Sequence, residues 1–487
     1  MKYIFQASFL LAILSLSSCT KEFLDTKPTT SVDAGSALTT VENAKASLNG
    51  IHRSMYMRYN DQGTFGQGTI MINADVLGED FVFSGQSNGW FVTAYRWIDH
   101  RSATGGAYFP YQFYYRIISN SNVIINGIDK TVGLPADKNN ILGQALTYRA
   151  WAYFNLVQLY GKRFVKGAAN DNLGVPLVLT NTITPQPRAT VAEVYNQVNN
   201  DLNRASALLT TARADKSNLN LSVVLGLQAR VALTQQDWAT AATKAAAART
   251  GYTLMNTAAQ FADGSASWTN PEWMWGSSQI DDQTEYFTAF LAYVSYNYNS
   301  TNIRTNPKLI STSLYNTMAA TDLRRALWVP TPTTANSVVP PGGSRAAFMN
   351  QKFKAKSDAN SVGDMPYMRA AEMFLIEAEA RARNNDEAGA KTVFTSFMQT
   401  RVPTYTTSAN TGAAFITEIM NSRRVELWGE GFRFFDLKRL DQALDRTGSN
   451  HNSALAVTMN VPAGDNLWQW VIPQSEINAN PLVKQND

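Results

Sequence analysis

One segment near the C-terminus gathers the kinds of charged side chain that acid–base catalysis uses. It reads RRVELWGEGFRFFDLKRL over residues 423–440. Carboxylates beside cations could act as a general acid, a general base and a clamp for an anion. Opposite charges at this spacing on a helix also form structural ion pairs, and we favour this second interpretation. The residues concerned are Arg424, Glu426, Glu430, Arg433, Asp436 and Lys438, and Gly429 and Gly431 fit a turn that ends a helix.

Aromatic residues are dense in two other segments, DFVFSGQSNGWFVTAYRWIDHR and DDQTEYFTAFLAYVSYNYNS, which both have the composition of loops. A sugar ring has an apolar C–H face edged by hydroxyl groups, so an aromatic ring beside a few amides or carboxylates suits it. Loops presented by a rigid scaffold commonly carry such sites. The candidate ligand-binding residues are Trp90, Phe83, Trp97, Asn88, Tyr286, Tyr296 and Tyr298.

Among these aromatic residues, Trp90 is the first choice, because Gly85, Gln86, Asn88 and Gly89 precede it and indicate an exposed loop. Trp97 fits a packing role as well as a binding role. Trp273 and Trp275 alternate along EWMWG, which predicts a short strand, and we expect both rings in the core.

Metal and redox chemistry have little support in the sequence. The chain has one cysteine and three histidines, His52, His100 and His451, without the spacing of a zinc site. We therefore expect no cofactor and no metal, although a calcium ion beside Asp281 and Asp282 stays open. The net charge of +4, without basic blocks, gives no footprint for nucleic acid.

The single cysteine, Cys19, follows an apolar leader that begins with Lys2 and is too short to span a bilayer. The residues Leu16-Ser17-Ser18-Cys19 look like a bacterial lipobox. We therefore predict that residues 1–18 are a lipoprotein signal peptide and that Cys19 is lipidated. Several acyl chains at this position would anchor the protein stably to a membrane.

Helical periodicity dominates the rest of the chain. The segment LSVVLGLQARVALTQQDWATAATKAAAAR places apolar residues on one face before and after a Gln-Gln-Asp turn, which predicts a helical hairpin. The segments ILGQALTYRAWAYFNLVQLYG and MPYMRAAEMFLIEAEARARNNDEAGAKTVFTSFMQTR have similar stripes. Small alanines in these stripes allow close stacking, as in tetratricopeptide-type solenoids. The predicted fold is mainly α, with tetratricopeptide-like hairpins as a scaffold and with long loops and a few short strands carrying the ligand site.

No linker divides the mature chain, so we expect one domain over residues 19–487. Within it we expect an N-terminal tether at 19–35. The helical scaffold is predicted at about 36–60, 110–250 and 366–445, and loop-rich regions for a ligand at about 61–109 and 260–345.

Six landmarks resemble the SusD/RagB family, the nutrient-binding surface lipoproteins of Bacteroidota. They occur in the family's order and run from Cys19 to Pro481. They are CTKEFLDTKP, YQFYYRIISNSNVIING, YRAWAYFNLVQLYG with NLGVPLVL, MPYMRAAEMFLIEAEA, RRVELWGEGFRFFDLKRL and VIPQSEINANP.

The resemblance implies a protein without catalytic activity that binds oligosaccharides or polysaccharides at the cell surface. It also implies delivery to a SusC-like TonB-dependent transporter of the outer membrane, with the lipid on Cys19 as anchor. Some family members are similar to peptide-binding proteins, so an oligopeptide ligand stays open. A glycoside hydrolase built on carboxylates such as Glu79, Asp80, Asp282 and Glu285, and a scaffold that binds only proteins, are further alternatives.

Overall fold

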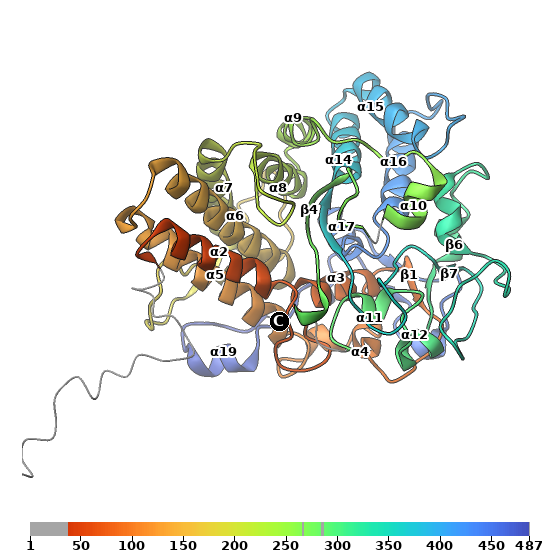
Figure 1. Ribbon diagram of the computed structural model, residues 1–487, viewed down its shortest axis with the longest axis horizontal. Helices are drawn as coiled ribbons and strands as arrows, with labels where there is room; N and C mark the ends of the chain where they lie inside the picture. The colour runs from red at the N-terminus through yellow and green to blue at the C-terminus, as the bar shows by residue number, and fades with distance from the viewer. Residues whose placement is uncertain (1–37, 265–266, 284–286, 487) are drawn as a thin grey trace, which may run out of the picture.

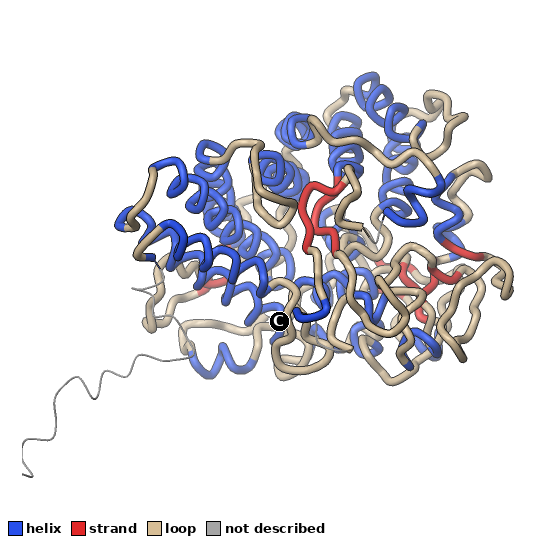
Figure 2. Tube along the Cα trace, in the orientation of Figure 1, coloured by secondary structure: helices blue, strands red, loops and turns tan. Residues whose placement is uncertain are grey.

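Antiparallel helices form one side of the molecule in the computed structural model, which describes residues 38–264, 267–283 and 287–486 (Figure 1). The predicted signal peptide, the predicted lipidation site Cys19, the predicted tether at 19–35 and Tyr286 lie outside these residues. The helices that pack against one another along this side are α2 (Val41–Ser54), α5 (Tyr108–Gly127), α6 (Pro135–Tyr160), α7 (Val191–Leu208), α8 (Leu221–Thr234) and α9 (Trp238–Ala248). The mainly α fold predicted from the sequence is confirmed (Figure 2).

The local sequence explains where these helices begin. Thr190 and Glu193 form a reciprocal capping box at the start of α7. Asn220 caps α8 by accepting a hydrogen bond from the Val223 amide, and Asp237 caps α9 in the same way. The predicted hairpin over residues 221–249 is therefore confirmed, with its turn between α8 and α9.

The scaffold continues after a long excursion of the chain. Strand β4 (Trp273–Ser277) pairs antiparallel with β8 (Met365–Arg369), which leads directly into α14 (Ala370–Arg383). Helix α14 packs against α9, and α15 (Glu387–Gln399) and α16 (Gly412–Glu426) pack against α14. The strand predicted around Trp273 and Trp275 is confirmed, and both rings are fully buried.

The other side of the molecule consists of loops, short helices and a small antiparallel sheet. The sheet has the order β1 (Phe81–Phe83), β5 (Lys308–Ile310), β7 (Met349–Asn350) and β6 (Trp328–Val329). Short helices include α4 (Val92–Tyr95), α10 (Ala258–Gly264), α11 (Leu291–Val294), α12 (Thr301–Thr305), α13 (Thr312–Tyr315), α17 (Arg433–Arg439), α18 (Ser453–Ala456) and α19 (Gln474–Ala479). The remaining strands are β2 (Leu173–Pro176), β3 (Arg188–Thr190), β9 (Leu444–Asp445) and β10 (Asn460–Val461).

Helix α3 (Gln67–Val76) lies inside the 61–109 segment for which the sequence predicts loops. Every residue from Gly68 to Val76 is buried. A helix that is covered on all sides has no polar face, so the amphipathic stripe that reveals other helices is missing here. This helix carries part of the floor of the site described below.

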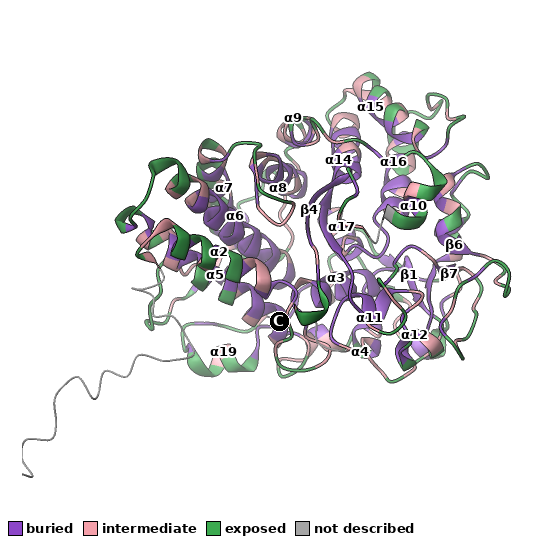
Figure 3. Ribbon diagram, in the orientation of Figure 1, coloured by how far each residue is buried: buried purple, intermediate pink, exposed green. Residues whose placement is uncertain are grey.

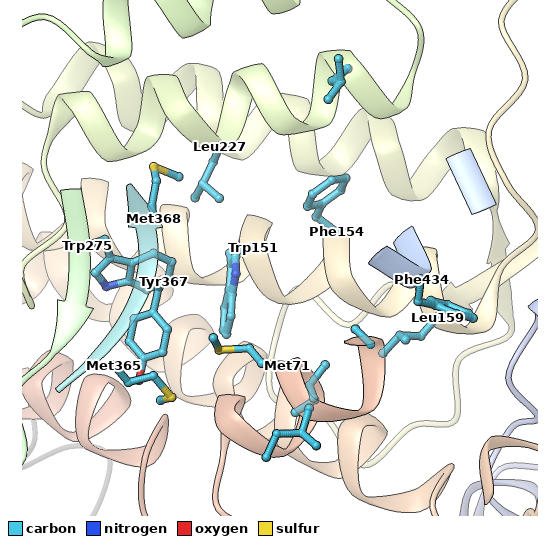
Figure 4. Packing of buried hydrophobic residues seen from close by; sticks show 14 of the residues in the cluster. Met71, Trp151, Phe154, Leu159, Leu227, Trp275, Met365, Tyr367, Met368 and Phe434 are labelled. Carbon is cyan, nitrogen blue, oxygen red and sulfur yellow. The ribbon is translucent and has the colours of Figure 1, made fainter. Parts of the chain in front are cut away.

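The core joins the scaffold to the loop-rich side (Figure 3). Figure 4 shows Trp151 of α6, Trp275 of β4 and Met71 of α3 within one layer of packed side chains. The rings of Trp151 and Trp275 meet edge to face, with centroids 5.5 Å apart. Elements distant in sequence are thus held in a single apolar core.

Most of the charged residues near the C-terminus form buried ion pairs, as their structural interpretation predicts, and Lys438 donates to the backbone carbonyls of Gln158 and Gly161. Arg369 donates to Glu426 at 2.9 Å and to Glu430 at 2.6 Å. Glu426 also accepts from Arg401 at 2.9 Å, and Lys352 donates to Glu430 at 2.7 Å. Gly429 and Gly431 have positive φ angles in the turn between α16 and α17, as predicted.

Across the part of the chain that the structure describes, no helix combines the length and the apolar character needed to cross a membrane.

Candidate functional site

A cavity of about 730 Å³ opens on the loop-rich side. Its wall comes from the loop at residues 60–64, the buried helix α3, the loop at 88–93 and the segment from 104 to the start of α5. Amides, hydroxyls and two carboxylates alternate there with aromatic rings. This mixture is typical of a pocket for a hydroxyl-rich molecule.

Trp90 forms part of this wall and is half-buried. Its ring meets Tyr293 edge to face, with centroids 5.9 Å apart. The hydroxyl of Tyr293 donates to the carbonyl of Gln62 at 2.8 Å, so the ring supporting Trp90 is itself fixed. The structure therefore holds the indole in one place beside the cavity.

Further aromatic rings pack against Tyr293, the ring that supports Trp90. Phe65 and Tyr293 stack with centroids 5.2 Å apart and planes within 8°. Phe91, which follows Trp90, contacts both of these rings edge to face. Phe91 has a φ of 61°, an uncommon conformation for a bulky residue, and this backbone turn lies next to the proposed binding ring.

The loop that carries Asn88 and Trp90 is tied to α12 and the residues after it. The side-chain oxygen of Asn88 accepts from Asn302 at 3.2 Å, and Oδ1 of Asn306 accepts from the Ser84 amide at 3.0 Å. The buried ammonium of Lys308 donates to Oδ1 of Asn302 at 3.1 Å. Asn88 is exposed and lines the cavity, as a binding role requires.

The floor is polar as well. The hydroxyl of Thr69 donates to the carbonyl of Gly63 at 2.8 Å and accepts from the Phe65 amide at 2.9 Å. Asn73 is only 5% exposed, and its Oδ1 accepts no hydrogen bond from any described residue. A buried acceptor without a donor is costly unless a ligand or water completes it.

Two carboxylates, Asp61 and Asp99, complete the cavity. Oδ1 of Asp61 accepts from the Gly63 amide at 2.8 Å, and Oδ1 of Asp99 accepts from the Gly106 amide at 3.2 Å. Burial raises the pKa of Asp99 above its ordinary value, and the nearby charge of Asp61 adds to this effect. A β-carbon at position 106 would overlap the Asp99 carboxylate, so the glycine is required there.

Three of the candidate residues prove to be core residues, which corrects the sequence-based choice. Phe83 is 2% exposed, Trp97 3% and Tyr298 0%. Phe83 lies in the buried strand β1 and stacks on Tyr95, while Trp97 packs edge to face on Trp468. Their rings are covered by the protein, so they offer no face to a ligand.

Tyr296 is half-buried but does not line this cavity, so the structure does not bring it together with Trp90. The sequence analysis missed Asp61, Asn73 and Asp99. The turn-like run Asn60-Asp61-Gln62-Gly63 was a usable signal, because short polar residues before a glycine indicate a loop. Asn73 gave no such signal in the sequence, because it lies in the apolar helix α3.

The carboxylates Glu79 and Asp80, considered for hydrolysis, are buried in ion pairs. Asp80 contacts Arg424 at 2.6 Å, and Glu79 contacts the same guanidinium at 3.2 Å. Burial raises the pKa of Asp80, but Arg424 and Arg433 outweigh it and hold the pKa below its ordinary value. These groups are structural ions, distinct from the residues that line the cavity.

The three histidines lie outside the residues that line the cavity. Burial lowers the pKa of His52, His100 and His451 to about 4, so all three are neutral at pH 7. Among the residues that the structure describes, no group of three or more histidine, cysteine, aspartate or glutamate side chains could hold a metal ion. Asp281 instead accepts a hydrogen bond from Asn360 at 3.2 Å.

Two family models match the chain. The model described as "SusD family" matches residues 265–487, and the one described as "Starch-binding associating with outer membrane" matches residues 22–233. No curated protein matches the sequence.

Solved structures match over nearly the whole chain. A SusD-like carbohydrate binding protein from Bacteroides vulgatus is 25% identical, with a TM-score of 0.79 over 91% of this chain and 97% of that chain. A SusD superfamily protein from Bacteroides thetaiotaomicron is 23% identical, with a TM-score of 0.79 over 92% of this chain and 100% of that chain. Surface glycan-binding protein A from Bacteroides fluxus is 18% identical, with a TM-score of 0.70 over 92% and 99% of the two chains.

Proposed function

We propose, from the premise that this chain belongs to the SusD family, that the cavity beside Trp90 binds an oligosaccharide or a polysaccharide. The family model over residues 22–233 is described as starch-binding, and one solved relative is named a carbohydrate binding protein. In this proposal the protein acts as a receptor and leaves its ligand chemically unchanged.

One observation supports this proposal above all. The indole of Trp90, which packs against Tyr293, lies in the wall of a large cavity that is also lined by amides, hydroxyls and carboxylates. The indole offers an apolar face to the C–H side of a sugar ring, and the polar groups can reach its hydroxyls. A cavity of about 730 Å³ has room for a short stretch of a glycan chain.

We further propose that the protein is an outer-membrane lipoprotein, attached through lipid on Cys19 and facing the exterior. In this proposal it delivers its glycan to a SusC-like TonB-dependent transporter. The lipobox-like residues before Cys19 support the anchor, and the description of the N-terminal family model, which names association with the outer membrane, supports the location.

Calorimetric titration of a glycan panel against wild-type protein and the Trp90→Ala variant tests the binding function. Loss of the stacking surface should weaken binding by about 1 to 3 kcal/mol, with little change in melting temperature. Trp238→Ala is the matched control, because Trp238 is also half-buried but lies on α9, away from the cavity. If the folded Trp90→Ala protein bound the glycan as tightly as the wild type does, this cavity would not be the binding site.

The same titration, extended to oligopeptides, and a reducing-sugar assay on the glycan panel separate the alternatives left open by the sequence. Binding of oligopeptides in place of every glycan would favour the peptide-binding branch. Sustained release of reducing sugar from a bound glycan would contradict a receptor without catalytic activity.

A further inference from the structure

We infer that Asp61 and Asp99 make the cavity selective for amine-bearing and neutral glycans over glycans that carry carboxylate or sulfate groups. This inference rests on the proposed function and names the substrate class of that site. It depends on three observations. The lining is negatively charged, the two aspartates have no ion-pair partner among the described residues, and Oδ1 of Asn73 accepts no hydrogen bond from them.

The charge of the lining has one sign. Asp61 and Asp99 are the only charged side chains among the described residues that line the cavity, and no lysine, arginine or histidine is present there. The field inside the cavity is therefore negative, and low-dielectric walls strengthen it. A polyanionic chain would enter against this field.

Neither aspartate forms an ion pair with a described residue; each instead accepts from a backbone amide, that of Gly63 or of Gly106. Most buried carboxylates elsewhere in the structure do have such partners, whereas Asp75 has none among the described residues. Asp201, for example, contacts Arg149 at 2.7 Å, and Glu379 contacts Arg439 at 2.7 Å. The cavity is thus a place where the fold keeps negative charge without neutralising it.

The floor points to the same ligand chemistry by a separate observation. Asn73 lines the cavity, and its buried Oδ1 accepts no hydrogen bond from any described residue. A ligand that completes Asn73, Asp61 and Asp99 together must supply hydrogen-bond donors. Sugar hydroxyls and protonated amines donate, whereas carboxylates and sulfates only accept.

Protonated amines gain more than hydroxyls from these two aspartates. A charge-assisted hydrogen bond is roughly twice as strong as a neutral one. A glycan with free amino groups, such as a glucosamine polymer, therefore ranks above the corresponding neutral glycan. A uronic-acid polymer of the same linkage ranks last, because it brings like charges to the carboxylates without a cation to offset them.

Matched hexasaccharides test this order. We would measure the affinity of the full-length protein for β-1,4-linked hexamers of glucose, glucosamine and glucuronic acid, and for the α-1,4-linked hexamers of the same three sugars, at low and at high salt. In whichever linkage series binds, the glucosamine hexamer should bind at least tenfold more tightly than the glucuronate hexamer. The gap should shrink at high salt, because salt screens charge interactions.

Asp61→Asn and Asp99→Asn assign the effect to the two carboxylates. Each should narrow the difference between the affinities for the glucosamine hexamer and the glucuronate hexamer, because each removes one negative charge from the cavity. The matched control is Asp445→Asn, because the exposed Asp445 also accepts a backbone amide, that of Thr447, at 2.9 Å and lies outside the cavity. Melting curves establish that each variant is folded.

The possible failures are distinguishable. Glucuronate binding as tight as glucosamine binding, or a gap that both cavity variants leave unchanged, would overturn the inference while the glycan-binding function stands. No binding of any hexamer in either series by folded wild-type protein would contradict the proposed function, and the inference would fall with it.

Discussion

The indole of Trp90 lies directly over Gly63, so closely that a β-carbon built at position 63 would come within 3.0 Å of Cζ3 of the indole. Gly63 has an ordinary backbone conformation, so the side chain is excluded by the tryptophan and not by the backbone. The glycine thus sets how deeply the ring sits against the loop at residues 60–64.

Gly63→Ala should push the Trp90 ring outward and weaken glycan binding several-fold, because the stacking surface loses its fixed position. Calorimetric titration with a ligand of the wild-type protein measures this, and near-ultraviolet circular dichroism reports the displaced indole. Gly50→Ala is the control, since a β-carbon at Gly50 meets no atom within 4 Å. Equal affinities of the Gly63→Ala and wild-type proteins would contradict the role given to this contact.

The fold was largely predictable because its scaffold is amphipathic. Helix α9 has an apolar stripe of alanines and begins at a polar cap, Asp237, both of which the sequence shows directly. Helix α3 has no such stripe, because every residue from Gly68 to Val76 is buried. The periodicity of apolar residues therefore reveals helices that have one solvent-exposed face. It misses helices such as α3 that other elements enclose.

The site was less predictable, because aromatic residues are equally suited to a core and to a ligand. Trp90 and Asn88 do line the cavity, whereas Phe83 and Trp97 are buried, and composition does not separate these cases. The two aspartates of the cavity are far apart in the sequence. Tertiary packing alone brings Asp61 and Asp99 together, so no local pattern could reveal the pair.

Replacement of Cys19 by alanine should leave the protein without lipid and absent from the outer membrane. The thiol is the group that the acyl chains would use, and the chain has no second cysteine to replace it. Labelling cells with an alkyne fatty acid and fractionating their membranes measures both effects. Ser18→Thr, which keeps the thiol, is a control for changes near the cleavage site. Labelling of the Cys19→Ala protein at the wild-type level would refute the anchor.

Arg369→Met should destabilise the protein by about 3 to 5 kcal/mol, because it leaves buried carboxylates without a shared counterion. Arg369 contacts Glu272 at 2.5 Å, Glu426 at 2.9 Å and Glu430 at 2.6 Å, and it is almost fully buried. Chemical denaturation followed by circular dichroism gives the change in unfolding free energy.

The control for this change is Arg163→Met, which removes a cation whose side chain is 29% exposed in its pair with Asp441. Exposed pairs contribute roughly 0 to 1 kcal/mol, so this variant should unfold almost as the wild type does. If the two variants were equally stable, the buried network would not hold the C-terminal region in place.

Asp75 should make stability depend on pH in the direction opposite to most carboxylates. It is almost fully buried on α3, and its Oδ2 accepts from the Gly431 amide at 2.6 Å. Burial raises its pKa to about 8. The folded protein therefore keeps a proton on Asp75 at pH 7 that the unfolded chain, with a pKa of about 4, has released. Stability from this group is complete below pH 4 and is lost as pH rises towards 8.

Asp75→Asn removes this dependence, because an amide stays neutral at every pH and can still accept from Gly431. The variant should melt close to the wild type at pH 4.5 and several degrees above it at pH 8.5, since each pH unit in this window costs the wild type up to about 1.4 kcal/mol. Differential scanning calorimetry at the two pH values measures the gap. Asp445→Asn, at an exposed aspartate whose pKa is lowered by its hydrogen bonds to Thr447, should show no such gain at pH 8.5. A gap of the same size at both pH values would mean that Asp75 is ionised in the folded protein.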